Sequence, residues 1–563
     1  MKQKKEKKNF FFLIKQFYIF TKTSLYSTFT MTKGKKSAIQ PTLLTSGESE
    51  LGPSWIPLYE SPVDFNAEHF EAAMLNIIRQ PNINSTVIMR ADILKENVYD
   101  PEKGDTMFTS KMINEIPEFP TNDDSPLLMR DLSDVNIRSI PESSQVHFAK
   151  RYEIVRRIIP RNPFKDYIIN QTCLMFTNNN DSNLVVYIPH IKSHEETPYY
   201  LPPVYGIGIY YNKSKVSIHY LPFGYEEGVG NSQEKLLRSM SDQERPIRIA
   251  LKLLTTASKH SRGTKLGYEK RVNHDLVVPK VNFQNQYITL KKKYLEYFMS
   301  NWGESTDPRK HVFEDIAIAA FMIEYWKLNN FEPENFEFRD LGCGNGLLVY
   351  ILMQEGYKGK GIDARARKSW KLYPKDVQEN LLEQIIVPNI LLEPHPSAAR
   401  LMSEEQVINN PLLKSNQICT TNDFPKNTFI IGNHSDELSC WIPLLGFPFI
   451  VIPCCSFGLD GVRKRYPPRK NTGLKTAPST YKALVDRVED IAILNGWKVE
   501  KEMLRIPSTR NAAIMSCIKI PTLIAEPEEI TKLRTLDIIA LEGGANGWVE
   551  NCINLMKKDP RSH

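Results

Sequence analysis

The stretch FEFRDLGCGNGLLVYILMQEGYKGKGID, residues 336–363, decides the fold class of this chain. Residues 336–341 alternate apolar and polar side chains, which is typical of a strand, and residues 347–352 repeat apolar side chains at helical spacing. Gly356 stands where that helix should end, and a second short strand leads to Asp363. The stretch therefore predicts one strand–helix–strand unit, of the size of a nucleotide-binding half.

The turn between that strand and helix carries Gly342, Gly344 and Gly346. Glycine lets a backbone turn sharply and approach a ligand without a Cβ in the way. The helix N-terminus adds free N–H groups and the positive end of a dipole. Asp363, at the tip of the second strand, is placed to accept hydrogen bonds from ribose hydroxyls. We therefore expect an adenosine-type cofactor to bind here.

The glycine spacing indicates which cofactor this is. A dinucleotide site needs G-x-G-x-x-G, and its third glycine would fall at Leu347. The observed pattern, D-x-G-x-G-x-G from Asp340, resembles instead the first motif of class I methyltransferases, which use S-adenosylmethionine. The resemblance assigns cofactor binding to Asp340, the three glycines and Asp363. A turn with only a structural role and an NAD site stay open as alternatives.

Length, charge and cysteine content set further bounds. The chain has 563 residues, enough for two or three domains, and its 24% charged and 41% hydrophobic residues fit a soluble globular protein. The net charge is +7, but residues 1–36 hold ten Lys and one Glu, so the remainder is near −2 and does not argue for nucleic-acid binding. The eight Cys show neither zinc spacing nor a secretory pattern. We expect a reducing, cytoplasmic compartment and no metal.

The N-terminal segment allows several interpretations. A lysine-rich start precedes an apolar run at residues 10–20, which is too short to span a bilayer, so we expect no membrane association. An extension without function, a disordered basic arm and a targeting segment all stay open, and Met31 is a second plausible start. We assign residues 1–53 to a disordered basic segment.

Residues 54–285 are expected to form an α+β domain with a mostly antiparallel sheet. The pattern predicts a helix over residues 67–79, a polar loop over residues 100–125 and a helix over residues 234–260 that breaks near Pro246. The predicted strands are residues 151–159, 168–176, 184–188, 204–211 and 215–220.

Two basic clusters with interleaved aromatic residues make this domain a candidate for RNA binding. They contain Arg156, Arg157, Arg161 and Lys165, then Lys259, Arg262, Lys265, Lys270 and Arg271. A solvated charged face is the alternative for each cluster.

Residues 286–525 are expected to form a Rossmann-like, seven-stranded, doubly wound α/β domain. A helix over residues 311–328, with Asp307 as its cap, precedes the glycine turn, and its Glu314 and Asp315 either complement the helix dipole or lie beside the cofactor. The other predicted elements are helices 291–302 and 481–494 and strands 417–420, 428–432, 449–453, 497–505 and 511–518. We expect residues 526–563 to form a peripheral helical tail.

Polar side chains follow the predicted strands at the edge where α/β sheets bind ligands. His434, Asp436 and Glu437 are candidates for proton removal or substrate placement, although a helix cap is the alternative for Asp436. In the methyltransferase plan Asp423 would contact the adenine, and an ordinary loop is the alternative. We expect the adjacent Cys454 and Cys455 to point in different directions, so that one metal ion could not easily take both. The RNA-contact candidates are Arg463, Arg465, Lys470 and Arg510.

Several segments together resemble one family, the tRNA (uracil-2′-O-)-methyltransferases that modify uridine 44 of serine tRNA. These are EDIAIAAFMI (314–323), RDLGCGNGLLVYIL (339–352), GKGIDARARKSW (359–370), IIGNHSDELSCWIP (430–443), FIVIPCCSFG (449–458) and IPSTRNAAI (506–514). The resemblance implies transfer of a methyl group from S-adenosylmethionine to a ribose 2′-hydroxyl, with serine tRNA as partner and an accessory protein as an open question. It places the base or orienting group at Asp436 or His434, with Glu437 next, and phosphate at Arg463 and Arg465. Larger members carry a C-terminal zinc module, which is not seen here, so no metal is carried over.

Two other classes of function stay open. One is a methyltransferase that acts on a protein or a small molecule, and the other is a non-catalytic RNA-binding partner with a degenerate cofactor site. Loss of serine tRNA binding with retained cofactor binding would favour the first, and a cofactor-binding test on the purified protein addresses the second.

Overall fold

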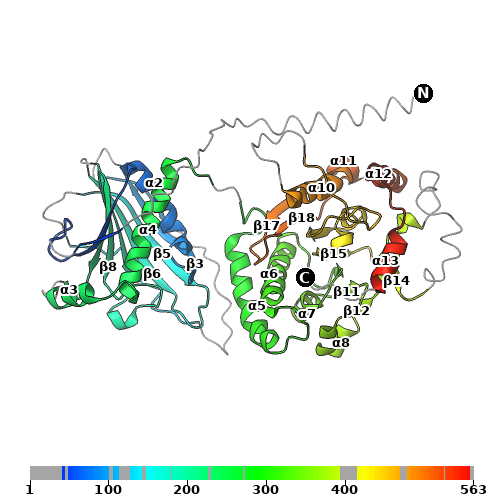
Figure 1. Ribbon diagram of the computed structural model, residues 1–563, viewed down its shortest axis with the longest axis horizontal. Coiled ribbons are helices and arrows are strands. Elements are labelled where there is room, and N and C mark those ends of the chain that lie inside the picture. The colour runs from blue at the N-terminus through cyan, green and yellow to red at the C-terminus, as the bar shows by residue number, and fades with distance from the viewer. Residues whose placement is uncertain are drawn as a thin grey trace, which may run out of the picture.

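The computed structural model has two folded parts with different sheets (Figure 1). It describes residues 41–44, 48–100, 106–112, 127–141, 148–178, 181–225, 230–269, 273–392, 415–469, 479–524 and 526–557. In these ranges no helix is both long enough and apolar enough to cross a membrane.

The front part is an antiparallel sheet of nine strands, in the order β1-β2-β9-β8-β7-β6-β5-β3-β4. The strands are β1 (Thr42–Leu43), β2 (Ile56–Pro62), β3 (Ile88–Tyr99), β4 (Met107–Met112), β5 (Ala149–Pro160), β6 (Ile169–Asn178), β7 (Ser182–Pro189), β8 (Gly206–Asn212) and β9 (Lys215–Leu221). Helices α2 (Ala67–Arg79) and α4 (Arg245–Lys265) cross one face of the sheet, and α3 (Gly230–Ser239) precedes α4 (Figure 1). The apolar faces of α2 and α4 share one buried cluster with the sheet. The predicted antiparallel sheet and the helix over residues 67–79 are confirmed.

Two expectations for the front part are wrong. Residues 107–112, placed in a polar loop, form β4, an edge strand whose side chains are all exposed, so no apolar face marked it in the sequence. Arg156, assigned to an RNA-binding cluster, is buried: its guanidinium donates hydrogen bonds to Gln171 and lies over the ring of Tyr187. Lys270 and Arg271 lie outside the described residues.

The second part is built on a seven-stranded sheet in the order β12-β11-β10-β15-β16-β18-β17. The strands are β10 (Glu337–Leu341), β11 (Gly359–Asp363), β12 (Leu381–Glu383), β15 (Thr428–Asn433), β16 (Phe449–Ile452), β17 (Glu500–Met503) and β18 (Ala512–Ser516). The first five in sheet order are parallel, and β18 runs antiparallel to both of its neighbours, β16 and β17. The carboxyl ends of β10, β11, β15 and β16 therefore meet at one edge of the sheet.

The third strand of this sheet differs from the prediction. Residues 418–420 form β14, which pairs with β13 (Ile385–Val387) in a separate two-stranded sheet, and the strand beside β11 is β12. Only three residues of β12 are paired, which is too short a run for its periodicity to be read from the sequence.

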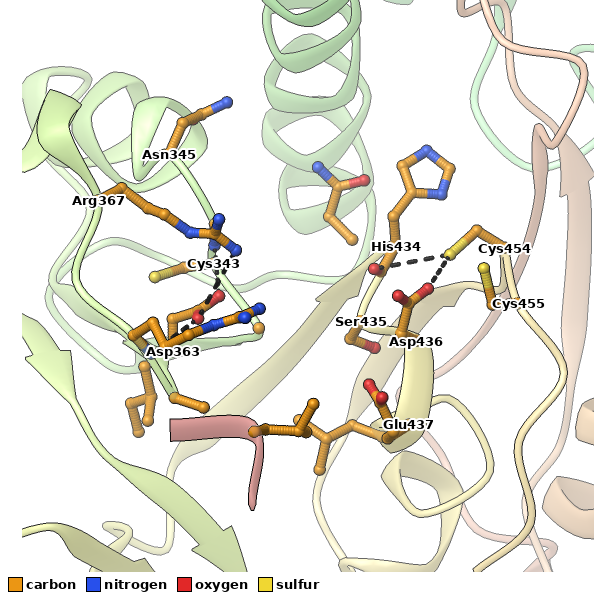
Figure 2. Close-up of a pocket in the computed structure, with 18 of the residues that line it drawn as sticks. Cys343, Asn345, Asp363, Arg367, His434, Ser435, Asp436, Glu437, Cys454 and Cys455 are labelled. Carbon is orange, nitrogen blue, oxygen red and sulfur yellow. Dashed lines mark hydrogen bonds and ion pairs between the residues drawn. The ribbon is translucent and has the colours of Figure 1, made fainter. Parts of the chain in front are cut away.

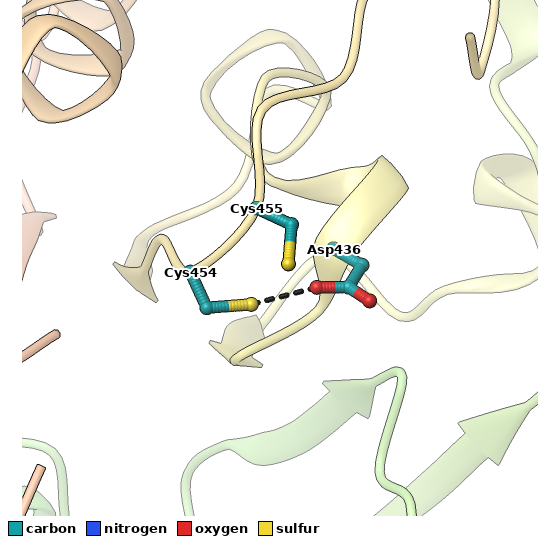
Figure 3. A group of neighbouring side chains, drawn as sticks. All are labelled: Asp436, Cys454 and Cys455. Carbon is teal, nitrogen blue, oxygen red and sulfur yellow. Dashed lines mark hydrogen bonds between the residues drawn. The ribbon is translucent and has the colours of Figure 1, made fainter. Parts of the chain in front are cut away.

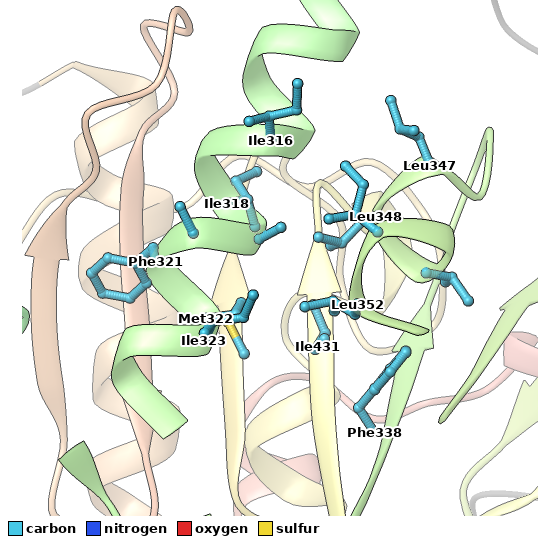
Figure 4. Close-up of a cluster of buried hydrophobic side chains, with 14 of the residues drawn as sticks. Ile316, Ile318, Phe321, Met322, Ile323, Phe338, Leu347, Leu348, Leu352 and Ile431 are labelled. Carbon is cyan, nitrogen blue, oxygen red and sulfur yellow. The ribbon is translucent and has the colours of Figure 1, made fainter. Parts of the chain in front are cut away.

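Helix α6 (Pro308–Leu328) packs on the sheet beside α7 (Leu347–Gln354) (Figure 4). Asp307 caps α6 by accepting a hydrogen bond from the Arg309 N–H at 2.9 Å, as the sequence predicts. Every residue from Ala317 to Trp326 is buried, and side chains from both helices and from β10 and β15 form one core. This packing places the first turn of α6 above the glycine turn.

The remaining helices are α5 (Lys280–Ser300), α8 (Lys375–Gln378), α10 (Thr480–Leu494), α11 (Pro521–Ile524), α12 (Glu528–Leu541) and α13 (Trp548–Met556). The tail is helical as predicted, but it is not peripheral. The buried Leu536, Ile539 and Trp548 pack into the core of the second part, and the Trp548 indole donates a hydrogen bond to the Ile386 carbonyl at 3.0 Å.

Polar contacts join the two parts near the segment where the chain passes from the first part to the second. The buried Arg90 donates a hydrogen bond to Asn285 of α5 at 2.8 Å. Glu502 of β17 accepts three backbone N–H hydrogen bonds from residues 275–277, at 2.7–2.8 Å. These contacts fix the segment that leads from the front sheet into α5.

Trp326→Ala should destabilise the second part by about 3–5 kcal/mol, because it empties a large buried site. The indole has no exposed surface, and its ring lies 4.8–6.1 Å from four other aromatic rings, counted between centroids. Denaturant unfolding followed by fluorescence measures the change. Leu328→Ala, two residues on at a site that is 48% exposed, is the control and should cost far less. Equal losses in the two variants would contradict the assigned core.

Candidate functional site

A cavity of about 480 Å³ lies at the edge of the second sheet where the parallel strands end. One wall is the glycine turn with Asp363 and Arg367, and the opposite wall is the turn from His434 to Glu437 with the two cysteines (Figure 2). The start of α6 and the end of α13 also contribute. The cavity thus joins segments that lie far apart in the sequence.

The glycine turn approaches the opposite wall closely. Gly342 has φ +80°, a backbone conformation that side chains rarely adopt, and a Cβ there would lie 3.2 Å from the Cα of Ser435. Gly342 and Gly344 line the cavity. Gly346 begins α7 and is buried against Leu381 and Tyr373, so it shapes the turn from behind.

Asp363 holds the glycine turn in place. Its carboxylate accepts a hydrogen bond from the Gly344 N–H at 3.0 Å and another from the Arg365 N–H at 3.1 Å. The Arg367 guanidinium lies 3.9 Å away. A carboxylate has about four lone-pair sites, so Asp363 can still accept hydrogen bonds from a ligand in the cavity, which it lines.

Asp340 lies beneath the turn rather than in the cavity wall. Its side chain is buried, and Oδ1 has no hydrogen-bond partner among the described residues. Burial, with the nearby charges of Asp315 and Asp363, raises the pKa of the Asp340 carboxyl well above its usual range. The structure therefore places Asp340 beneath the turn, where burial favours the protonated form of its carboxyl.

Asp423 is not among the residues that line the cavity in the described part of the chain. Its carboxylate accepts hydrogen bonds from the N–H and the hydroxyl of Thr420, at 3.0 and 2.8 Å, and so caps a short helical turn. The side of the cavity beyond Asp363 is formed by Gln384 to Ile386 and by α13. No motif marks these residues in the sequence, because their short strands depend on tertiary pairing.

The first turn of α6 contributes two acids with different environments. Glu314 Oε1 lies 3.0 Å from His434 Nε2. Asp315 is buried and accepts hydrogen bonds from Asn433 at 3.2 Å and from Asn345 at 3.5 Å. Burial, and then the charge of Glu314, raise the pKa of Asp315 to about 7. Both acids line the cavity, so the expectation that they lie beside a ligand site fits better than dipole complementarity alone.

The turn after β15 places His434, Asp436 and Glu437 on the cavity wall, as predicted. His434 has φ +54° and Asp436 has φ +39°, both in the left-handed region. Such conformations cost about 1–3 kcal/mol in a non-glycine residue and are concentrated at functional sites. His434 Nδ1 is buried without a hydrogen-bond partner among the described residues. A tautomer with its proton on Nε2 would donate to Glu314 and leave a lone pair on Nδ1.

The two adjacent cysteines do not point apart, which corrects the expectation from the sequence. The Sγ atoms of Cys454 and Cys455 and a carboxylate oxygen of Asp436 lie within 4.8 Å of one another. The Cys454 thiol donates to Asp436 Oδ1 at 2.7 Å. Its contact with Cys455, together with burial, raises the pKa of Cys454, and the same contact lowers that of Cys455.

A second cavity, of about 530 Å³, adjoins the first and shares Cys454, Cys455 and Arg510 with it. We call it the basic groove; its other lining residues are Ser456, Arg463, Lys464, Arg465, Thr480, Tyr481 and Leu484. Three of the four predicted RNA contacts, Arg463, Arg465 and Arg510, therefore meet here. The fourth, Lys470, lies outside the described residues.

Two other residues of the basic segment 463–470 (RKRYPPRK) have structural roles. Tyr466 is buried, and its hydroxyl donates to the Phe457 carbonyl at 2.7 Å, so it offers no ring for a base to stack on. Arg469 pairs with Glu489 and Asp490 of α10, at 2.9 and 2.5 Å between charged atoms.

Comparison with known proteins gives the family. Residues 28–271 match a family model described as a TRM44-like, N-terminal bet v1-like domain, and residues 277–388 match one described as a predicted AdoMet-dependent methyltransferase. A tRNA (uracil-O(2)-)-methyltransferase of Debaryomyces hansenii is 56% identical over 94% of this chain and 99% of its own length. The chain belongs to the tRNA (uracil-O(2)-)-methyltransferase family. Proteins of that name from Saccharomyces cerevisiae and Schizosaccharomyces pombe are 47% and 33% identical, over 92% and 90% of this chain and 96% and 94% of theirs.

Asp315→Asn tests the buried carboxyl beside the cavity. In the folded chain the pKa of Asp315 is about 7, whereas an unfolded Asp titrates near 3.9. The folded state holds this proton more tightly, so the stability that Asp315 contributes is complete in acid and is lost as the pH rises through about 7. The difference in melting temperature between the variant and the wild type should shift in the variant's favour by a few degrees between pH 5 and pH 8.

Asp376→Asn, on the exposed surface of α8, is the matched control and should change the melting temperature little at either pH. If the difference in melting temperature between Asp315→Asn and the wild type were the same at both pH values, the raised pKa of Asp315 would be contradicted.

Proposed function

We propose that this protein is a tRNA 2′-O-ribose methyltransferase that uses S-adenosylmethionine and forms 2′-O-methyluridine at position 44 of serine tRNA. The observation that carries the proposal is the adjacency of the two cavities. A site suited to the cofactor, with a proton acceptor on its wall, opens beside a groove lined by Arg463, Arg465 and Arg510. The similarity to tRNA methyltransferases over nearly the whole chain supports the same activity.

The domain division differs from the sequence prediction at two boundaries. We infer an α+β domain that ends before α5, a methyltransferase domain that begins with α5 near residue 280, and a helical tail from residue 526. The expected disordered segment 1–53 is wrong for its described end, because β1 pairs in the front sheet and Leu51 packs into the front core. The expected boundary at residues 285/286 is also wrong, because it falls inside α5, whose Phe283 packs into the second core. The boundary between the two family-model matches, near residues 271–277, supports the central division. The strand order and the antiparallel pair at the end of the sheet support a Rossmann-like, class I methyltransferase fold for the second domain.

The residues of the first cavity fit S-adenosylmethionine. Gly342 and Gly344 leave room for a ligand to approach the backbone, and the Asp363 carboxylate can accept hydrogen bonds from ribose hydroxyls. Asp315 and Asp340 are held close together, so a cationic ligand would relieve their repulsion, whereas the pyrophosphate of NAD would add to it. When bound, S-adenosylmethionine supplies the electrophilic methyl group.

His434 is our choice for the group that accepts the proton of the ribose 2′-hydroxyl. A hydroxyl is a poor nucleophile until its proton is removed or shared. Glu314 fixes one ring nitrogen of His434, and the other carries no competing hydrogen bond from a described residue. The Asp436 carboxylate accepts a hydrogen bond from the Cys454 thiol, so it is better suited to fixing the turn in place than to accepting the substrate's proton. Glu437, on the same turn, lines the cavity further along.

The basic groove is where we place the phosphates of the tRNA. Arg463 and Arg465 are exposed, and Arg510 stands between the groove and the first cavity. Guanidinium groups bind phosphate bidentately, so a nucleotide next to the target uridine can be fixed here while its ribose enters the first cavity. Arg161 and Lys165 of the front domain are exposed and remain candidates for a second contact. We propose a cytoplasmic location and leave room for an accessory protein.

The test is the methylation state of nucleotide 44 of serine tRNA in cells that lack the gene. Wild type should restore 2′-O-methylation, whereas Asp363→Ala should not, because it removes the acceptor that holds the Gly344 N–H. Asp376→Ala, an exposed Asp→Ala change, is the control and should restore the modification. Unchanged methylation in the deletion would refute the tRNA assignment. If the purified protein then still bound S-adenosylmethionine, a protein or small-molecule substrate would be favoured; if it did not, a non-catalytic role would be.

His434→Asn should lower kcat by about 10²–10⁴-fold, the usual contribution of a general base, and leave the Kd for S-adenosylmethionine nearly unchanged. Glu314→Gln should show a smaller loss of the same kind, because the ring keeps a hydrogen-bond partner but loses the charge that orients it. Single-turnover assays with tRNA transcripts measure the first quantity, and calorimetry measures the second. His194→Asn, at an exposed front-domain site, is the matched control. A loss confined to cofactor binding would contradict the assigned role.

A further inference from the structure

Asp436, Cys454 and Cys455 form a compact set of metal-ligand side chains on the cavity wall (Figure 3). Their three ligand atoms lie within 4.8 Å of one another, and the Cys454 sulfur is 2.7 Å from Asp436 Oδ1. The set combines two turns: one follows β15 and the other follows β16. Both sulfurs point toward the carboxylate in the view of Figure 3.

The local backbone explains why adjacent cysteines converge. In an extended strand, successive side chains point to opposite faces. However, β16 ends at Ile452, and the chain bends at Cys455, so the two cysteines lie beyond the alternating part. Asp436 reaches them from the neighbouring turn through its left-handed φ of +39°. Three separate features of the backbone therefore bring these atoms together.

We propose that Asp436, Cys454 and Cys455 bind one Zn²⁺ ion, with its fourth coordination position open to the first cavity. Two thiolates with one carboxylate suit zinc, whereas Mg²⁺ and Ca²⁺ prefer sets made only of oxygen. Zinc–sulfur and zinc–oxygen bonds of about 2.3 and 2.1 Å place tetrahedral ligand atoms roughly 3.3–3.8 Å apart. At present the Cys454 Sγ and Asp436 Oδ1 atoms are closer than this, at 2.7 Å, and all three atoms lie within 4.8 Å of one another, so binding requires the side chains to shift.

The surroundings favour the metal-bound form. Arg510 Nη1 donates to the Cys454 carbonyl at 2.5 Å and lies 3.5 Å from the Cys455 sulfur. A guanidinium at this place stabilises thiolates and fixes the loop that carries them, which is the role of the residues behind a metal's ligands. All three ligands are partly buried, and all three line the first cavity, so the ion would have one open side.

The open coordination position would give the ion a catalytic role, and this role rests on the proposed function. A hydroxyl oxygen that enters the cavity could coordinate Zn²⁺, and coordination lowers the pKa of a bound hydroxyl strongly. The 2′-hydroxyl proton would then pass to His434 at a lower cost. Zinc binding itself requires only the three side chains, so it can be tested without tRNA or cofactor.

The test begins with the metal content of the full-length protein, reduced under argon, supplied with Zn²⁺ and passed over a weak chelating resin. Mass spectrometry of the metal should find about one Zn²⁺ per chain in the wild type and almost none in Cys454→Ser/Cys455→Ser. Cys517→Ser is the control, because Cys517 is a partly buried thiol outside the set, and it should keep the ion. Replacement with Co²⁺ should give a sulfur-to-cobalt charge-transfer band that the double variant lacks.

A second measurement needs no substitution and so does not depend on how the variant folds. Zn²⁺ should protect Cys454 and Cys455 of the reduced wild type from maleimide, as mapped by peptide mass spectrometry, and should leave labelling of Cys517 unchanged. Absence of bound zinc, zinc retained in a folded double variant, or equal labelling with and without zinc would each overturn the site. A protein that methylates tRNA but binds no zinc refutes only this inference, and one that binds zinc but does not methylate refutes only the proposed function.

Discussion

The close approach of two backbone turns is the constraint on which the site depends. The turn after β10 and the turn after β15 meet so tightly that a Cβ on Gly342 would lie 3.2 Å from Ser435. From the other side, a Cβ on Gly432 would lie 2.1 Å from Ile442 and 2.9 Å from the Ser435 hydroxyl. Gly342 therefore needs glycine for its φ of +80° as well as for space, whereas a side chain on Gly432 would displace the side chains of Ile442 and Ser435. The turn that carries His434 and the glycine turn face each other because these two strand ends come close together.

The buried acids around this contact make the site more favourable for a positively charged ligand than for a negatively charged one. Asp340, Asp315 and Asp363 lie near one another, and the pKa values of Asp340 and Asp315 are raised because their charges are poorly solvated. Asp363 is stabilised differently, by two backbone N–H groups. The site therefore combines a carboxylate held by backbone N–H groups, Asp363, with one buried acid on the cavity wall, Asp315, and one beneath the glycine turn, Asp340. An arrangement of this kind suits a sulfonium better than a phosphate.

The sequence predicts what local periodicity and turn chemistry determine. The unit from residue 336 to 363, the Asp307 cap and the polar turn after β15 all follow from patterns within a few residues, and the structure agrees with each. Three features could not be read this way. The third strand is only three paired residues, Trp548 reaches the site from the end of the chain, and Cys454 and Cys455 converge through a bend. Each depends on partners that are distant in the sequence, which no spacing rule records.

The tail and the front domain show why the active site needs the whole chain. Helix α13 lines the cavity and anchors to β13 through Trp548, so the last helix closes a wall that the central sheet leaves open. At the other end, Glu502 of β17 holds residues 275–277, and Arg90 holds Asn285 of α5. The front sheet is thus tied to α5 through Arg90, and the segment that leads into α5 is tied to β17 through Glu502. Such a fixed relation between the two parts would let a substrate much larger than either cavity contact one part while its reacting group is oriented in the cavity of the other.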